Sequence, residues 1–293
     1  NGDGRPDGVE IIARKLTMPS GIAFHDGDLY IGARDRIYRF SNIEARLDQP
    51  GKPEIVKDDL PDKSHHGWKY LAFGPDGRLF IPVGVPCNIC EPEAPHGSIL
   101  SYDIVSRNTI TFVSGIRNSV GFDWHPDTAE LWFTDNGRDM LGDDVPPDEL
   151  NRVSHRGLHF GYPHIHGANI PDPKFGEGHA PGDYAAPALA IQAHSAALGM
   201  KFYTGDQFPE RYRGAIFIAE HGSWNRSKKV GYQVSVAFLD GNRVVGYEPF
   251  VTGWLEGQKS WGRPNDVLVA PDGSLLISDD QGGVIYRVTY AGM

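Results

Sequence analysis

The stretch Ser64–Gly84 reads SHHGWKYLAFGPDGRLFIPVG, and its pattern decides the fold of the whole chain. An apolar run at Leu71–Phe73 leads into a Gly-Pro-Asp-Gly turn, and a second apolar run follows at Leu79–Val83. Glycine in the turn accepts a positive φ, which lets two antiparallel strands connect tightly. The stretch therefore predicts a β-hairpin with polar residues placed just before its first strand.

This strand–turn–strand unit recurs along the chain. Its five copies begin at Gly21, Tyr70, Gly121, Gly199 and Asp266. Phe24, Phe73 and Phe122 take the same place in the first three copies, so the repeat there is about 49 residues long. A period of about 40–50 residues with about four strands per unit is typical of β-propeller blades. We predict an all-β, six-bladed β-propeller with about five repeats visible and an incomplete first blade, and a five-bladed ring is the alternative.

Length and composition favour one domain over residues 1–293. The chain contains 36 Gly and 22 Pro, which is typical of many short strands joined by turns. It begins in an Asp/Gly-rich turn, and we expect further strands upstream. Residues 138–197 interrupt the repeat and are rich in Gly, Pro, His and Asp, so they predict an inserted cap over one mouth of the ring.

Charge and hydropathy exclude two classes of partner. The formal net charge of −10 argues against nucleic acid, and no basic tract interleaved with aromatic residues occurs. No apolar run reaches the roughly 18 residues that a membrane-spanning helix needs. The two cysteines stand at Cys87 and Cys90, where a small local disulfide and two free thiols both remain open.

Polar residues recur just before the repeats. His65, His66 and Lys69 precede the second copy, Arg117 and Asn118 the third, and Arg263 and Asn265 the fifth, while the fourth ends in the segment 221–226. Equivalent points of propeller blades converge on one mouth of the central channel. Guanidinium groups bind carboxylates in a bidentate manner, so the pattern predicts a site for a planar polyanion.

An acidic, glycine-containing segment follows at residues 135–151. Carboxylate and carbonyl oxygens are the ligands that Ca²⁺ prefers, but the spacing does not match an EF-hand loop. A calcium site and a solvated acidic turn are therefore both open from spacing alone.

With these motifs in place, the chain resembles the PQQ-dependent soluble aldose and sorbosone dehydrogenases, where PQQ is pyrroloquinoline quinone. The matching segments are HHGWKYLAFGPDGRL, GIRNSVGFDWHPDTAELWFTDNGRD, DELNRV, LGMKFYTGDQFPERYRG, AEHGSWNR and GRPNDVLVAPDGSLLISDD, and they lie between residues 64 and 290. The segment Pro86–Glu91 favours the sorbosone-dehydrogenase branch. PQQ carries three carboxylates and an ortho-quinone, so it is a planar polyanion of the expected kind.

The resemblance implies roles for individual residues. His66 matches the general base that removes a hydroxyl proton while hydride passes to the quinone. The residues implied in cofactor binding are His65, Lys69, Arg117, Asn118, His194, Arg226, Arg263 and Asn265. Gly137 and Arg138 match backbone positions that hold an active-site Ca²⁺, and Asp148 and Glu149 match acidic residues near a structural calcium.

The resemblance also implies the activity. We expect an oxidoreductase that oxidises a sugar (an aldose, sorbosone or a related alcohol or aldehyde) with calcium-bound PQQ and passes electrons to an external cytochrome or quinone. Family members are exported, which implies a periplasmic or secreted location. Two alternatives stay open: a calcium-dependent, lactonase-like hydrolase on a propeller, and a propeller that binds partners without catalysis.

Overall fold

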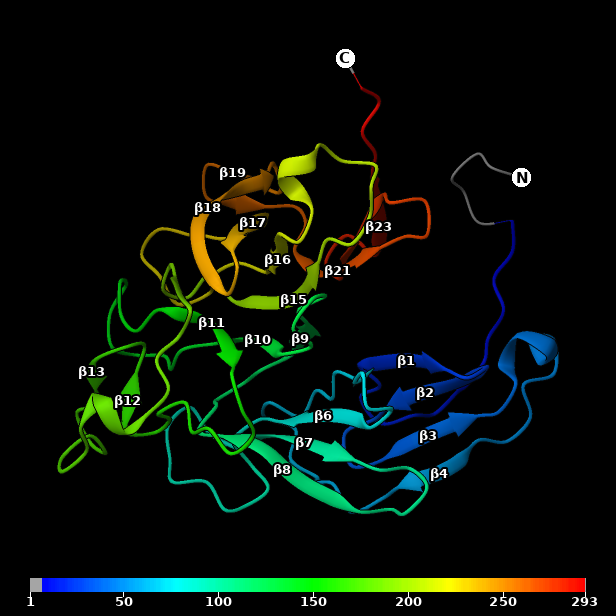
Figure 1. Ribbon diagram of the computed structural model, residues 1–293, viewed down its shortest axis with the longest axis horizontal. Helices are drawn as coiled ribbons and strands as arrows, with labels where there is room; N and C mark the ends of the chain where they lie inside the picture. Colours follow the sequence, from blue (N-terminus) through cyan, green and yellow to red (C-terminus); the bar gives the residue numbers. More distant parts are fainter. Residues whose placement is uncertain (1–6, 293) are drawn as a thin grey trace.

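The computed structural model describes residues 7–292, which form five antiparallel sheets that follow one another around the molecule (Figure 1). Blade 1 consists of β1 (Gly21–His25), β2 (Asp28–Gly32), β3 (Ile37–Phe40) and β4 (Glu54–Lys57). Blade 2 consists of β5 (Ala72–Phe73), β6 (Leu79–Val83), β7 (Ser98–Tyr102) and β8 (Thr109–Ser114). Blade 3 consists of β9 (Gly121–Trp124), β10 (Leu131–Asp135), β11 (Asp148–Val153) and β14 (Leu189–Ile191). Blade 4 consists of β15 (Ala197–Phe202), β16 (Ile216–Glu220), β17 (Gln233–Asp240) and β18 (Arg243–Val251), and blade 5 of β21 (Pro264–Val269), β22 (Leu275–Asp279) and β23 (Val284–Val288).

Each blade pairs its strands in chain order, so the first strand of each repeat lies innermost and the propeller expected from the repeat is confirmed. Two small hairpins lie outside the blades: β12 (Ile165–His166) with β13 (Ile170–Pro171), and β19 (Leu255–Glu256) with β20 (Lys259–Ser260). The helical turns in the described part of the chain are three 3₁₀ segments, η1 (Ile43–Arg46), η2 (Pro181–Asp183) and η3 (Glu210–Tyr212). None of these is long or apolar enough to cross a membrane.

The second strand of each central blade is buried on both faces. In β10, Leu131 and Phe133 pack toward blade 2, whereas Trp132 between them packs toward blade 4. Because successive side chains of a strand point to opposite faces, a blade between two neighbours needs apolar residues at every position. Burying each large apolar side chain contributes about 1.5–3 kcal/mol, so the contacts between blades hold the ring together.

Several repeats begin with glycine because a larger residue would not fit there. A Cβ on Gly21 would lie 1.9 Å from the carbonyl oxygen of Lys69, and one on Gly121 would lie 2.2 Å from that of Leu198. Each of these oxygens belongs to the segment that leads into, or forms, the inner strand of another blade. The inner strands therefore approach one another so closely that only glycine fits.

One side of the ring differs from the others. Apolar clusters join blades 1 and 2, 2 and 3, 3 and 4, and 4 and 5, but within residues 7–292 no cluster joins blades 5 and 1. Apolar side chains of the two facing sheets are exposed there, at 72% for Ile22 and 71% for Ile285. The sheet that is one strand short is the C-terminal one, and the sixth blade stays a prediction.

The expected cap needs a correction in extent. Residues 138–197 are not one insertion, because β11 within them pairs with β10, and β14 pairs with β11, so both are outer strands of blade 3. The sequence of β11 is DELNRV, whose polar residues hide a strand that is buried almost throughout. The excursion from the blade is therefore the shorter stretch between β11 and β14, which carries the hairpin β12–β13.

Candidate functional site

The polar segments before the repeats meet in one cavity of about 620 Å³. All five blades contribute to its wall, through Ser20 before β1, His66 before β5, Arg117 before β9, His194 before β15 and Arg263 before β21. These positions share one phase of the repeat, so the closing of the sheets around an axis brings them together.

Most residues predicted from the sequence line this cavity, namely His65, His66, Arg117, Asn118, Gly137, Asp148, His194, Arg263 and Asn265. The remaining four, Lys69, Arg138, Glu149 and Arg226, are not part of its wall. The wall also contains residues to which the sequence patterns assigned no individual role. Asp139 and Asn225 belong to the segments 135–151 and 221–226 that the sequence indicated, whereas Trp68 and Asp266 lie outside both.

His66 is held in one tautomer. Its Nδ1 lies 2.8 Å from the carbonyl oxygen of Val85, which can only accept, so Nδ1 carries the proton and the neutral ring keeps an unprotonated Nε2. Burial, the Arg117 guanidinium and His65 lower the pKa of His66 to about 3. The value is well below the ordinary range expected from the sequence, and His66 is neutral at physiological pH.

The backbone around His66 is unusual. His66 has a φ of 50°, in the left-handed region that non-glycine residues rarely adopt. A Cβ on Gly84 would lie 2.6 Å from Cβ of His66, so only glycine allows the end of β6 to pass this close. His194 (φ 65°) and Ala196 (φ 55°), which also line the cavity, are left-handed as well. Such conformations cost on the order of 1–3 kcal/mol each and gather at functional sites.

Two buried aspartates present the cationic segments to the cavity. Asp135 ends β10, and its carboxylate accepts the backbone N–H groups of Arg117 and Asn118, each at 2.7 Å. Asp279 ends β22 and accepts the backbone N–H of Arg263 at 2.8 Å. The same device thus positions an arginine in blades 3 and 5. The recurrence of an aspartate at the end of the second strand, in TDNG and SDDQ, was the available signal for it.

Arg117 is buried and fully engaged along one edge. Its Nε donates to the carbonyl oxygen of Asn88 at 2.9 Å, and its Nη2 donates to Oδ1 of Asn88 at 2.9 Å and to Asp139 at 3.0 Å. Nη1 has only a long bond of 3.4 Å, to the carbonyl oxygen of Asn136. The guanidinium therefore offers its Nη1 to a ligand.

Arg263 is held differently. Its Nε and Nη2 donate to the carbonyl oxygens of His221 (3.0 Å) and Gly222 (2.6 Å), and its guanidinium lies 5.5 Å from the ring of Tyr232. Within residues 7–292 it forms no ion pair with a carboxylate. Its positive charge is consequently less compensated than that of Arg117.

A chain of hydrogen bonds links the two sides of the cavity. Asp139, which pairs with Arg117, also accepts from Nδ2 of Asn225 at 2.6 Å. Asn225 approaches Nδ1 of His194 at 3.4 Å, and Nε2 of His194 bonds to the carbonyl oxygen of Gly142 at 2.9 Å. His194 lies in the cavity wall, and these partners fix its ring, while its role in cofactor binding stays a prediction.

The predicted cations outside the wall have partners that explain their positions. Nζ of Lys69 donates to the carbonyl oxygen of Gly67 at 2.8 Å, and burial together with Arg34 lowers the pKa of Lys69 to about 8. Arg226 ties the loop of Asp143 and Asp144 to the rest of the chain. Proximity in sequence to a motif did not determine the direction in which these side chains extend.

Arg138 has a structural partner as well. Its Nη1 donates to Asp172 at 2.5 Å, and Asp172 also binds Nε2 of His166 at 2.9 Å. Its side chain thus belongs to the excursion of blade 3, so only its backbone remains for the role that the resemblance implied.

The predicted acidic residues are occupied by N–H donors. Asp148 accepts from Gly137 at 2.9 Å and from Ala196 at 2.7 Å, and Glu149 accepts from Gly167 at 2.8 Å and from Asn151 at 2.9 Å. Burial raises the pKa of Asp148 to about 7 and, with the charge of Asp135, that of Glu149 to about 8. Among the described residues, no three His, Cys, Asp or Glu side chains have the geometry of a metal site. The carboxylates therefore do not fit a calcium cage.

An ionisable cluster that the sequence patterns did not indicate lies beside the cavity, whose wall includes two of its members, Tyr70 and Asp266. It combines Tyr70, Asp123, Lys201 and Asp266, which come from inner segments of four different blades. Nζ of Lys201 lies 3.4 Å from Asp123, and burial raises the pKa of Asp266 to about 6. These residues alternate with apolar ones in ordinary strands, so only the ring brings them together.

Comparisons with known proteins agree with this geometry. Residues 33–287 match the family described as Glucose / Sorbosone dehydrogenase. The chain belongs to the glucose/sorbosone dehydrogenase family. This confirms the resemblance seen in the sequence, and the matched span includes every cavity-lining residue named above except Ser20.

Individual relatives of this glucose/sorbosone dehydrogenase family member cover nearly its whole length. An uncharacterized protein of Borreliella burgdorferi is 37% identical over 296 residues, which is 96% of this chain and 78% of that protein. The calcium structure of a Trichoderma reesei enzyme of carbohydrate-active family AA12 has a TM-score of 0.80 at 19% identity, covering 97% of this chain and 85% of that one. The holo form of the pyranose dehydrogenase PQQ domain from Coprinopsis cinerea has a TM-score of 0.80 at 17% identity, covering 99% and 86%. At these identities the solved structures show a shared fold.

Proposed function

We propose that this family member is a PQQ-dependent dehydrogenase that oxidises a sugar, either an aldose, sorbosone or a related alcohol or aldehyde. One observation carries the proposal: the neutral imidazole of His66 lines the same cavity as Arg117 and Arg263, which come from separate blades. The PQQ-containing neighbour of the same fold supports this choice of cofactor.

The residues of the cavity fit a planar tricarboxylate. Arg117 offers Nη1 and Arg263 a guanidinium without a carboxylate partner, and both would bind carboxylates through charge-assisted hydrogen bonds. Asn118 and Asn225 each have a buried amide oxygen without a hydrogen-bond partner among the described residues. These oxygens would accept from ligand N–H groups or sugar hydroxyls.

His66 would act as the general base. Its Nε2 is the free acceptor, so it would take the proton of the substrate hydroxyl while Val85 keeps the ring oriented. When bound, PQQ supplies the ortho-quinone that accepts the hydride. A polyanion beside His66 would also raise the pKa of the imidazole from its low value, because negative charge favours the protonated ring.

In this proposal, calcium would be bound by backbone carbonyl groups and not by carboxylate side chains. Since the carboxylates of Asp148 and Glu149 already accept N–H groups, the carbonyl groups of Gly137 and Arg138 are the remaining predicted ligands, and we assign no chemical step to the ion. Dialysis against a chelator followed by PQQ titration with and without added calcium tests this dependence.

The surroundings of the enzyme complete the proposal. The disulfide between Cys87 and Cys90 suits a periplasmic or secreted protein, because disulfides persist in oxidising compartments. A separate cytochrome or quinone would then take the electrons.

The test combines binding and turnover. Purified protein is titrated with PQQ, and dye reduction is followed with a panel of aldoses and sorbosone. We expect PQQ to bind and at least one sugar to reduce the dye, and His66→Asn to bind PQQ with turnover lowered about 10²–10⁴-fold. Asparagine tolerates the left-handed backbone at this position, so the variant removes the base with little added strain. Failure to bind PQQ, or lactone hydrolysis without it, would overturn the assignment.

A further inference from the structure

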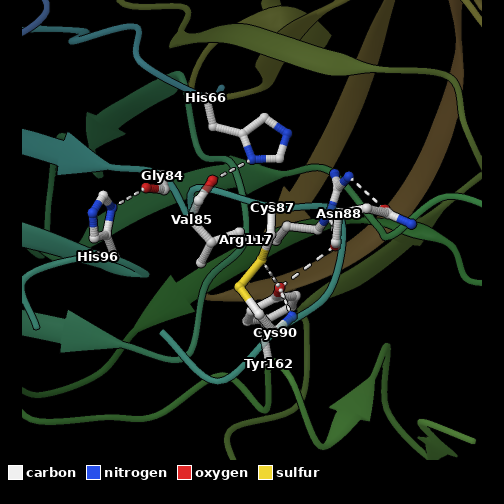
Figure 2. The surroundings of a disulfide bond; sticks show 9 residues. All are labelled: His66, Gly84, Val85, Cys87, Asn88, Cys90, His96, Arg117 and Tyr162. Carbon is white, nitrogen blue, oxygen red and sulfur yellow. Dashed lines mark hydrogen bonds between the residues drawn. A yellow bond between two sulfur atoms is a disulfide. The ribbon is translucent and has the colours of Figure 1, made fainter. Parts of the chain in front are cut away.

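The segment Gly84–Cys90 connects the disulfide to the candidate site (Figure 2). Its carbonyl oxygens are accepting groups for three side chains: Gly84 for His96 at 2.9 Å, Val85 for His66 at 2.8 Å and Asn88 for Arg117 at 2.9 Å. Two of these side chains line the cavity, although Asn88 itself does not. The segment therefore lies directly behind the wall and holds it.

The side chain of Asn88 forms three hydrogen bonds with residues of blade 3. Its Oδ1 accepts from Nη2 of Arg117 at 2.9 Å and from the backbone N–H of Asp139 at 2.8 Å, and its Nδ2 donates to the carbonyl oxygen of Asp139 at 3.1 Å. Both partners of Oδ1 are donors and the partner of Nδ2 is an acceptor, so only one orientation of the amide satisfies all three bonds. Asn88 thus clamps Arg117 and the aspartate that pairs with it.

The clamp also sets which edge of Arg117 is free. The backbone oxygen of Asn88 accepts the Nε–H of Arg117, and its Oδ1 accepts one of the two Nη2 hydrogens. Asp139 accepts the other Nη2 hydrogen. A guanidinium has five N–H donors in a fixed planar fork, so occupying this edge directs Nη1 away from it.

The disulfide restricts the clamp. Cys87 and Cys90 flank Asn88 and Ile89, and the bond between them closes a loop of only four residues. Tyr162 fixes the loop from outside, since its hydroxyl lies 3.0 Å from the backbone N of Cys90 and 3.5 Å from Sγ of Cys87. Without the covalent bond, the loop would have to order Asn88 by hydrogen bonds alone, at the cost of backbone entropy.

We propose that Asn88, held by the Cys87–Cys90 disulfide, is a positioning residue that aims Arg117 at the anionic ligand of the cavity. Reduction of the disulfide by a dithiol, which adds two electrons and two protons and leaves two thiols and an oxidised dithiol, frees the loop and weakens anion binding. The identity of the anion as PQQ rests on the proposed function, whereas the positioning of Arg117 does not.

The experiment measures the arginine and the ligand separately. Hydrogen exchange of the ligand-free protein is followed by NMR at the Nη2 protons of Arg117, one of which bonds to Oδ1 of Asn88, and PQQ affinity is measured by titration. Asn88→Ala is expected to speed exchange of these protons at least tenfold and to weaken PQQ binding about 10–100-fold, because the charge-assisted bond from Nη2 to Oδ1 of Asn88 is lost together with the two side-chain bonds to the backbone of Asp139. The exposed Asn169 serves as the matched control, and Asn169→Ala should change both quantities less than twofold.

Two further variants separate positioning from general stability. Asn88→Asp keeps both accepting contacts of the side chain, so it should restore slow exchange at Arg117 while its added negative charge still weakens PQQ binding. Cys87→Ser with Cys90→Ser should weaken binding about 3–10-fold, with sugar turnover at saturating PQQ changed less than threefold. Native protein that is reduced with dithiothreitol, alkylated and freed of the dithiol before PQQ is added should show the same loss, because PQQ then meets no other reductant. The proposal would be overturned if Asn88→Ala left the exchange rate at Arg117 unchanged, even if the variant lowered the melting temperature. If the native protein shows slow exchange but binds no PQQ, the proposed function fails and the positioning role stands.

Discussion

The two sides of the cavity are built in different ways. On the side of blades 2 and 3, Arg117 is 5% exposed and pairs with Asp139, and a disulfide-closed loop holds it from behind. On the side of blades 4 and 5, Arg263 rests on backbone carbonyl groups without a carboxylate partner, and Trp224 nearby is 68% exposed. The first side favours fixed geometry, and the second offers less compensated charge and an accessible aromatic surface.

The largest expected difference between the sides is in stability. Arg117→Gln should lower the free energy of unfolding by about 2–4 kcal/mol, because removing the buried guanidinium leaves the partly buried Asp139 and the oxygens of Asn88 without their donor. Arg263→Gln should lower it by less, about 1–2 kcal/mol, since two bonds to backbone carbonyl groups are lost and no carboxylate is left without its cation. Urea unfolding of both variants measures the contrast, and equal losses would show that the two sides are equally rigid.

The pH dependence of stability should come partly from the first side. The pKa of His66 is about 3 in the folded chain, while an unfolded imidazole titrates near 6.5, so the unfolded chain binds this proton first as the pH falls. The stabilising contribution is complete above pH 6.5 and is lost as the pH falls from 6.5 toward 3, by on the order of 5 kcal/mol in full.

His66→Asn should flatten the stability curve in this pH window. The exposed His155 provides the control, because His155→Asn should leave the curve as it is in the native chain. The measurement is urea unfolding at a series of pH values, and a curve of native steepness in His66→Asn would place the acid sensitivity elsewhere.

Ligand affinity should depend strongly on the second side. Arg263→Gln should weaken PQQ binding about 10–100-fold, since charge-assisted bonds to a carboxylate contribute about 1.5–3 kcal/mol. Arg263→Lys keeps the charge but not the planar fork of donors, so its affinity for PQQ should lie between those of the native protein and Arg263→Gln. Isothermal titration calorimetry at two salt concentrations tests this, and native affinity in both variants would remove Arg263 from the site.

The smallest effect is expected at the rim. Trp224→Ala should change stability by no more than about 0.5 kcal/mol, because the side chain is exposed. If the ring provides a surface for the sugar, the KM for the sugar should rise about 2–10-fold with kcat preserved, as expected for an aromatic contact of about 0.5–1.5 kcal/mol. Steady-state kinetics across the sugar panel decides whether the second side selects the substrate.

Much of the architecture could be predicted from local patterns. The alternation and turn of Ser64–Gly84 recur, and the 49-residue spacing of Phe24, Phe73 and Phe122 follows from them. The strand β11 was missed because DELNRV is polar, yet it is buried by its place in blade 3. Local rules detect a strand when its residues are apolar or alternate with polar ones. They fail for a buried strand of polar residues, whose side chains are stabilised there by hydrogen bonds.

The sequence by itself determined the repeat, the strand-end positions of His66, Arg117 and Arg263, and the family resemblance, because each of these is a local pattern of residue types. Only the tertiary structure decided that Lys69 turns from the cavity, that Val85 sets the tautomer of His66 and that Asn88 holds Arg117. These contacts either join segments that are remote in sequence or depend on the direction in which one side chain extends. Their geometry is fixed by how the blades pack around the axis.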